Sequence, residues 1–351
     1  MYMQNPFSIS FGRINKNYIE RDSEIQPIFD DFNSDSIRNT VYVITGPRGC
    51  GKTVTLSHVI DEYKKQDNWV VARLSQSNNM LEQMASILYE NGLTKYKFLK
   101  TEFSFSFQGI SFSVKGKEPV SSIHVYLSKL LEYYKKKNIR VLVAIDDIAK
   151  NDGMLEFIRA YQGFLIDHYD VFLLMSGLYK NISKLETDRS LTFLFRAPKI
   201  KLSPLSLNAI ALSYQDTFNI SEEKSISLAK ITKGYALAYQ VLGDIIFRNK
   251  EKMDDKRILK EFDIKLSEWS YEIIWSELSN QERKILILIS DSCFSNQKIM
   301  EELNISKGNL AIYKKRLSDE GLINATTRGN SSLSLPRFDN FIKNKELIEE
   351  I

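Results

Sequence analysis

Residues 46–53 have the sequence Gly-Pro-Arg-Gly-Cys-Gly-Lys-Thr, which fits the pattern Gly-x-x-x-x-Gly-Lys-Ser/Thr. The apolar run 41–44 precedes the pattern and a predicted helix, 53–65, follows it. In this setting the glycines allow consecutive backbone N–H groups to surround phosphate oxygens at the positive end of a helix. Lys52 is expected to reach the terminal phosphates, and the Thr53 hydroxyl is expected to bind Mg²⁺. The stretch therefore predicts a nucleotide site, the alternative being a glycine-rich turn without a ligand. The residues predicted to contact the nucleotide are Gly46, Pro47, Arg48, Gly49, Cys50, Gly51, Lys52, Thr53 and Val54.

A pair of carboxylates ends another apolar run. Residues 141–145 read Val-Leu-Val-Ala-Ile and are followed by Asp146 and Asp147. Asp146 is expected to hold Mg²⁺ through water, and Asp147 to orient or deprotonate the attacking water. Alone, such a pair is more often a solvated strand end, but together with residues 46–53 it indicates phosphoanhydride hydrolysis. Because the second acid is Asp rather than Glu, its reach is shorter and hydrolysis is expected to be slow.

Two further residues are candidates for catalysis. Ser176 follows the apolar run 171–175 and could contact the γ-phosphate or the attacking water, or could instead cap the next helix. Arg189 and Arg196 flank an apolar segment, and either could act as an arginine finger on a neighbouring subunit's nucleotide. The alternative for both arginines is an exposed ion pair.

Strands and helices alternate over the first half of the chain. The predicted strands are 41–44, 69–74, 141–145 and 171–175, and the predicted helices are 53–65, 80–89, 121–137 and 154–167. This alternation predicts an α/β fold with a parallel sheet covered on both faces. Within 103–115, Phe and Ser alternate around Gln108-Gly109, which predicts an inserted hairpin. After Pro204 the pattern becomes helical.

The C-terminal part, from Trp269 onward, is predicted to be a separate compact module. Ser279 and Glu282 form a possible capping box for a helix over 279–289, and helices over 295–303 and 306–320 follow. Two short strands flank a turn at 328–330, so the order resembles a winged helix-turn-helix. In the third helix, Ile312 and Leu317 are expected to be buried. Residues 305–330 contain five basic and two acidic side chains, which favours DNA binding over protein contact with solvated lysines. The predicted DNA contacts are Lys307, Asn309, Lys314, Lys315 and Arg328.

Composition excludes several classes of protein. The chain has 351 residues, which at about 150 residues per domain suggests two or three domains. Hydrophobic residues make up 43%, charged residues 26%, and the net charge is +4, as in soluble, mildly basic proteins. The two cysteines and three scattered histidines give no disulfide framework and no zinc spacing. No apolar run approaches the ~18 residues of a membrane helix, and no signal peptide is visible. We therefore expect a cytoplasmic enzyme or regulator that does not bind membranes.

With these motifs in order, the chain resembles the AAA+ and STAND-type ATPases, specifically the origin-recognition-like and archaeal-type branch, over roughly residues 5–340. Asn5-Pro6-Phe7 resembles the adenine-side segment of bacterial members. The segment 194–205 is similar to the connection between the core and the lid, which in the family carries the finger arginine and so favours Arg196. The segment 233–238 is similar to the lid motif, with Ala236 in place of proline and no sensor arginine; there Tyr235 is expected to pack near the base.

The resemblance implies a P-loop NTPase parallel sheet of the AAA+ type, an all-α lid and a winged helix-turn-helix. The expected domains are residues 1–203 (with N-terminal segment 1–22 and a hairpin at about 103–115), 204–268 and 269–351. It implies ATP and Mg²⁺ as ligands, double-stranded DNA and a homo-oligomer as partners, and slow hydrolysis that drives a conformational or oligomeric switch. The alternatives are a STAND-type signalling switch whose winged helix contacts a protein, and a nucleotide-binding scaffold with little turnover.

Overall fold

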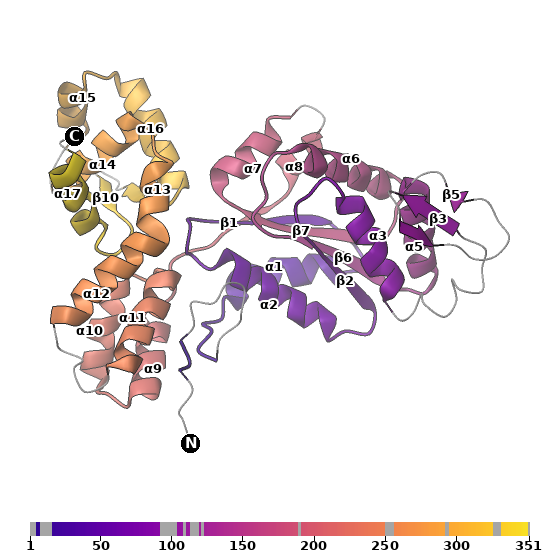
Figure 1. The fold of residues 1–351 in the computed structure, drawn as a ribbon, viewed down its shortest axis with the longest axis horizontal. Coiled ribbons are helices and arrows are strands. Elements are labelled where there is room, and N and C mark those ends of the chain that lie inside the picture. Colours follow the sequence, from indigo (N-terminus) through magenta and orange to yellow (C-terminus); the bar gives the residue numbers. More distant parts are fainter. Residues whose placement is uncertain are drawn as a thin grey trace. The chain divides into compact units, whose positions relative to one another are not determined.

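The chain divides into two compact units. The computed structural model describes residues 5–7, 16–91, 104–107, 110–112, 119–120, 123–188, 191–249, 256–291, 295–325 and 331–349 (Figure 1). The first unit contains Met1–Glu20, Gly46–Lys52 and Leu202–Ile351, and the second contains Arg21–Thr45 and Thr53–Lys201. Across these described ranges, no helix has both the length and the apolar character that crossing a membrane requires.

The second unit is built on a parallel five-stranded sheet. Its order is β2 (Trp69–Leu74), β6 (Arg140–Ile145), β7 (Val171–Gly177), β1 (Val41–Thr45) and β8 (Lys199–Lys201). Every neighbouring pair is parallel, so the predicted parallel sheet is confirmed. Strand β8 was not predicted, because Lys-Ile-Lys is short and two of its three residues are charged. At the edge of a sheet such a strand is tolerated, since its lysines remain in solvent.

Helices cover both faces of this sheet, as predicted. They are α1 (Asp22–Phe32), α2 (Lys52–Lys64), α3 (Met80–Glu90), α5 (Ile123–Lys136), α6 (Asp152–Ile166), α7 (Tyr179–Glu186) and α8 (Thr192–Arg196). On one face Phe32 of α1 packs on Phe172, with ring centroids 4.8 Å apart, and Tyr63 of α2 packs on Trp69 at 4.4 Å. The alternate residues of the strands join the side chains of α3, α5 and α6 in a second core. Both faces of β1 and β7 are therefore buried, which explains their continuous apolar sequences.

A small sheet is inserted between α3 and α5. It contains β3 (Ser104–Phe107), β4 (Ile110–Phe112) and β5 (Pro119–Val120), in the order β4-β3-β5. The antiparallel pairing of β3 with β4, with Phe105 opposite Phe112, confirms the predicted pairing of these strands. The Gln108-Gly109 dipeptide lies outside the described residues.

The C-terminal part of the first unit is mainly helical. Its elements are α9 (Leu207–Phe218), α10 (Glu222–Thr232), α11 (Ala236–Arg248), α12 (Lys256–Leu266), the π-helix η3 (Ser267–Tyr271), α13 (Glu272–Ser276), α14 (Asn280–Ser290), α15 (Asn296–Leu303), α16 (Lys307–Asp319), β9 (Ile323–Ala325), β10 (Ser331–Leu333) and α17 (Phe338–Glu349). Serine side chains cap α9, α10, α14, α15 and α16 by accepting backbone N–H bonds. The predicted capping box of Ser279 and Glu282 is confirmed. Strands β9 and β10 pair antiparallel.

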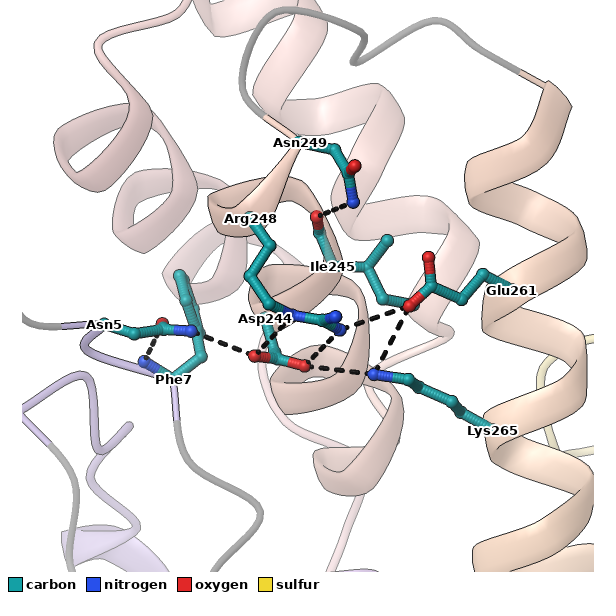
Figure 2. Close-up of polar contacts among 8 residues, drawn as sticks. All are labelled: Asn5, Phe7, Asp244, Ile245, Arg248, Asn249, Glu261 and Lys265. Atoms are coloured by element: carbon teal, nitrogen blue, oxygen red, sulfur yellow. Dashed lines mark hydrogen bonds and ion pairs between the residues drawn. The ribbon is translucent and has the colours of Figure 1, made fainter.

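The described N-terminal residues pack on helices α9 and α11 of this unit. Phe7 is 3% exposed, and its ring stacks on Phe218 of α9 with centroids 5.5 Å apart. Gly243 of α11 makes room for the ring, because a Cβ there would lie 2.4 Å from it. Figure 2 shows Asn5 donating to Asp244 at 2.9 Å, beside the ion pairs that Asp244 makes with side chains of α11 and α12. The described N-terminal residues therefore contribute to the hydrophobic core between α9 and α11.

Candidate functional site

The predicted phosphate loop connects β1 to α2. Gly49 and Gly51 have φ angles of +77° and +100°, which side chains of L-residues rarely adopt, so these positions require glycine. The Lys52 ammonium donates to the backbone carbonyls of Gly46 and Pro47, at 3.0 Å each. Thr53 and Val54 are half-buried in the first turn of α2. The strand, loop and helix thus follow one another as an anion-binding loop demands.

Within the first unit, Tyr235 contacts the backbone of the same loop. Its buried hydroxyl donates to the Arg48 carbonyl at 2.6 Å and shares a hydrogen bond with the Ser270 hydroxyl at 2.8 Å. The Leu237 N–H donates to the Gly49 carbonyl at 3.0 Å. Burial raises the pKa of Tyr235 above its ordinary value, so the phenol is protonated at neutral pH and acts as the donor to Arg48. Tyr235 was expected near a nucleobase, and the structure places its hydroxyl on the loop itself.

In the second unit, Asp146 and Ser176 are brought together at the carboxyl end of the sheet. Ile145 of β6 lies opposite Met175 of β7, so the next residues along the two strands are neighbours. The fully buried Ser176 hydroxyl donates to Oδ1 of Asp146, and the Asp147 N–H donates to the same oxygen at 3.0 Å. Ser176 therefore orients the carboxylate that was predicted to hold the metal.

The second oxygen of Asp146 fits a cation. Oδ2 is buried and accepts no hydrogen bond among the described residues, and Arg73 Nη2 lies 3.8 Å from it. A buried carboxylate oxygen without a donor is costly unless a positive charge compensates it. Mg²⁺ prefers such oxygen ligands and retains several waters. The second carboxylate oxygen of Asp146 is thus a suitable ligand for the predicted Mg²⁺ ion, and the Thr53 hydroxyl is the other predicted ligand.

Asp147 occupies a constrained backbone position with an exposed side chain. Its φ is +50°, in the left-handed region that Asp tolerates better than most residues. The Gln76 amide donates to the Asp147 carbonyl at 2.5 Å and accepts from the Ala149 N–H at 2.9 Å. Gln76 therefore fixes the peptide, while the carboxylate stays accessible to water, as a base that acts on water requires.

Comparison with known families agrees with this arrangement. Residues 18–190 match a family described as an ATPase domain predominantly from Archaea. This segment is an ATPase domain of the AAA+ type. The match assigns ATP hydrolysis to the domain and covers the loop 46–53, the pair Asp146 and Asp147, and Ser176. A comparison with curated protein sequences finds no match.

Solved structures extend the similarity beyond the ATPase domain. An ORC2 protein from Aeropyrum pernix, solved as ADPNP–ADP complexes, is 16% identical with a TM-score of 0.58, over 96% of this chain and 97% of that chain. The Cdc6p protein from Pyrobaculum aerophilum is 17% identical with a TM-score of 0.51, over 98% and 97%. At these identities the similarity is one of fold, and it extends over nearly the whole chain.

Two residues beside the acidic pair of the ATPase domain were missed by the sequence analysis. Arg73 pairs with Asp146, and its signal was a charged residue inside the apolar run 69–74. Gln76 supports Asp147 through a contact between distant segments, for which the sequence gives no local signal. Arg196 is the exposed last residue of α8, so a neighbouring subunit could reach it, and its role as a finger stays a prediction. Arg189 lies outside the described residues.

The predicted DNA contacts on α16 do not share one environment. Lys307, Asn309 and Lys315 are exposed, whereas Arg328 lies outside the described residues. Lys314, a predicted DNA contact, is half-buried and donates to the Asn296 side chain at 2.6 Å. Burial lowers the pKa of Lys314. Lys314 therefore faces α15 rather than solvent.

The expectation that Ile312 is buried is wrong. Its side chain is 53% exposed, whereas Leu310 and Leu317 are 2% and 1% exposed. On an α-helix, positions 310, 314 and 317 share one face, and position 312 lies away from it. Helical periodicity, rather than residue type, decides which side chains of α16 are buried.

Proposed function

We propose that the chain binds ATP with Mg²⁺ at the loop 46–53 and that slow hydrolysis drives a conformational or oligomeric switch. The observation that carries the proposal is the buried Oδ2 of Asp146, which accepts no hydrogen bond among the described residues while Ser176 and a backbone N–H hold Oδ1. A carboxylate held in this orientation can bind a cation through its second oxygen.

Each residue of the site has a distinct task in this proposal. Lys52 contacts the terminal phosphates after leaving its carbonyl partners, and Thr53 and Asp146 hold the metal. Bound Mg²⁺ neutralises charge on the phosphate oxygens. The exposed Asp147 orients the attacking water, and Arg196 acts on the nucleotide of a neighbouring subunit in a homo-oligomer.

We further propose that the C-terminal module is a winged helix that binds double-stranded DNA. The order of α14, α15 and α16, followed by the antiparallel pair β9 and β10, is typical of that module. Lys307, Lys315 and Arg316 are exposed on α16, which supports contact with phosphates. The alternative is a signalling switch whose module contacts a protein, which the exposed Ile312 also favours.

Calorimetric titration with Mg-ATP tests the nucleotide site. Lys52→Ala should abolish tight binding, because the variant loses the ammonium group that we propose contacts the β- and γ-phosphates. Lys64→Ala, which removes an exposed lysine from the last turn of the same helix, is the matched control and should bind as the wild type does. Equal affinity of Lys52→Ala and Lys64→Ala would refute the phosphate-loop assignment.

Duplex binding as a function of salt tests the DNA proposal. Binding through phosphates releases counterions, so affinity should fall steeply as salt increases. Fluorescence anisotropy with a labelled duplex, with and without ATP, measures this slope. Absence of duplex binding at low salt would refute DNA binding and would favour the alternative, in which the module contacts a protein.

A further inference from the structure

The solvent-facing side of α16 carries one large apolar side chain, Ile312. It is 53% exposed on a helix whose two leucines, Leu310 and Leu317, are buried. Gly308, Ile312 and Lys315 follow one another at spacings of four and three residues, so they form one face of the helix. Exposure of a branched apolar side chain at the centre of this face is unfavourable in water, and contact with an apolar group would remove that cost.

Nothing from its own helix covers Ile312 on the N-terminal side. Gly308 lies one turn earlier, and a Cβ built there would meet only Ser306 Oγ, at 3.9 Å. A ligand can therefore approach the helix backbone closely and still reach Ile312. A partner that fits this face must be able to lie along an α-helix.

Charge on the same face identifies the class of partner. Lys315 and Arg316 are exposed one turn after Ile312, and the exposed Lys307 begins the helix. The acidic residue nearest to Ile312 on this helix, Asp319, is half-buried at its end. This arrangement complements a polyanion whose phosphates flank a groove. The DNA major groove is wide enough for an α-helix and has phosphates on both sides.

We infer that Ile312 reads the C5-methyl group of thymine in the major groove, while Lys307, Lys315 and Arg316 contact the flanking phosphates. The inference rests on the proposed DNA-binding function. Of the four bases only thymine presents a methyl group in this groove, and the other major-groove edges present hydrogen-bonding groups. Ile312 can neither donate nor accept a hydrogen bond, so packing on those polar edges would desolvate them without compensation. Ile312 is thus assigned as a residue that determines specificity.

The test begins with the full-length protein, Mg-ATP and a random library of 20-base-pair duplexes. The affinity of the most enriched duplex is measured by anisotropy, and each thymine is then replaced singly by deoxyuridine, which removes only the methyl group. Replacement at the contacted position should weaken binding about fourfold, the effect of one buried methyl-sized group. Replacement at the other positions should have little effect.

The variant Ile312→Ala completes a double-mutant cycle. It should bind the thymine duplex more weakly than the wild type and should no longer distinguish thymine from deoxyuridine at the contacted position. Leu212→Ala, at a position that is 60% exposed on α9, is the control and should keep the distinction. Because Ile312 is exposed, both variants should have the thermal stability of the wild type, which a melting curve checks.

The outcomes separate this inference from the function on which it rests. No duplex binding at low salt would refute both. Duplex binding with equal affinity for thymine and deoxyuridine at every position, or enrichment of duplexes without thymine, would refute only the role of Ile312. A thymine preference that persists in Ile312→Ala would also refute it, because another side chain would then contact the methyl group.

Discussion

The hydroxyl of Ser176 donates a hydrogen bond to the carboxylate of Asp146, joining the ends of two neighbouring strands. The Ser176 side chain has no exposed surface, so the packing around it holds the hydroxyl in place against Asp146. One carboxylate oxygen is thereby engaged, and the other accepts no hydrogen bond among the described residues and lies 3.8 Å from Arg73 Nη2. The geometry of the predicted metal site depends on a residue that does not need to touch the nucleotide.

Ser176→Ala should therefore increase the Mg²⁺ concentration needed for half-maximal ATP turnover. Hydrogen bonds to charged groups contribute about 1.5–3 kcal/mol, so an increase of roughly tenfold or more is expected. A Mg²⁺ titration at saturating ATP measures it, with the half-buried Ser183→Ala in α7 as control. An unchanged Mg²⁺ requirement together with reduced turnover would instead place Ser176 at the γ-phosphate.

Asp147→Asn should retain Mg-ATP binding and lose turnover. Asp146 still serves the metal in this variant, but the side chain that acts on water is no longer a base, and such groups typically contribute 10²–10⁴-fold. Calorimetry and a phosphate-release assay measure the two quantities separately. Turnover at the wild-type rate would show that another group activates the water.

Lys315→Ala and Lys314→Ala should differ in their effect on duplex binding. Lys315 is exposed, so its loss should flatten the dependence of log affinity on log salt by about 0.9 for one phosphate contact. Lys314 donates to Asn296 and is half-buried, so its loss should leave the slope nearly unchanged. Anisotropy at several salt concentrations distinguishes the two variants, and the opposite order would contradict the assignment of faces on α16.

Phe7→Ala should destabilise the first unit by about 3–5 kcal/mol, the usual cost of emptying a buried aromatic site. The ring is 3% exposed and contacts Phe218, Tyr214 and Tyr239. Chemical denaturation monitored by tryptophan fluorescence measures the loss, with the exposed Leu212→Ala as control. Equal stability of the two variants would mean that the N-terminal segment does not contribute to the helical core.

Much of the fold was predictable because its signals are local. The sequence 46–53, the buried strands and the capping box of Ser279 and Glu282 each depend on residues close together in the chain. The buried face of α16 could also be predicted from helical periodicity, because positions 310, 314 and 317 lie on the same side of an α-helix. By the same period Ile312 lies away from this face, so the expectation that it is buried was wrong, and Lys314 is half-buried beside Asn296.

The contacts that support the site were not predictable in the same way. Gln76 reaches Asp147 only because β2 lies beside β6, and Tyr235 reaches Arg48 across 187 positions of sequence. Such pairs follow from the order of strands and the packing of helices. A single sequence shows which residues are present, but it does not show which of them come into contact in the fold.

The attachment of Asn5 and Phe7 to helices α9 and α11 also has a consequence for how the chain is made. Asn5 and its partner Asp244 are 239 positions apart, so during synthesis the N-terminal residues emerge long before α11 exists. Contacts of such long range form slowly, because a large loop must close before they contribute. Phe7 can pack against Gly243 only after the ribosome has completed α11, which makes this docking a late step in folding.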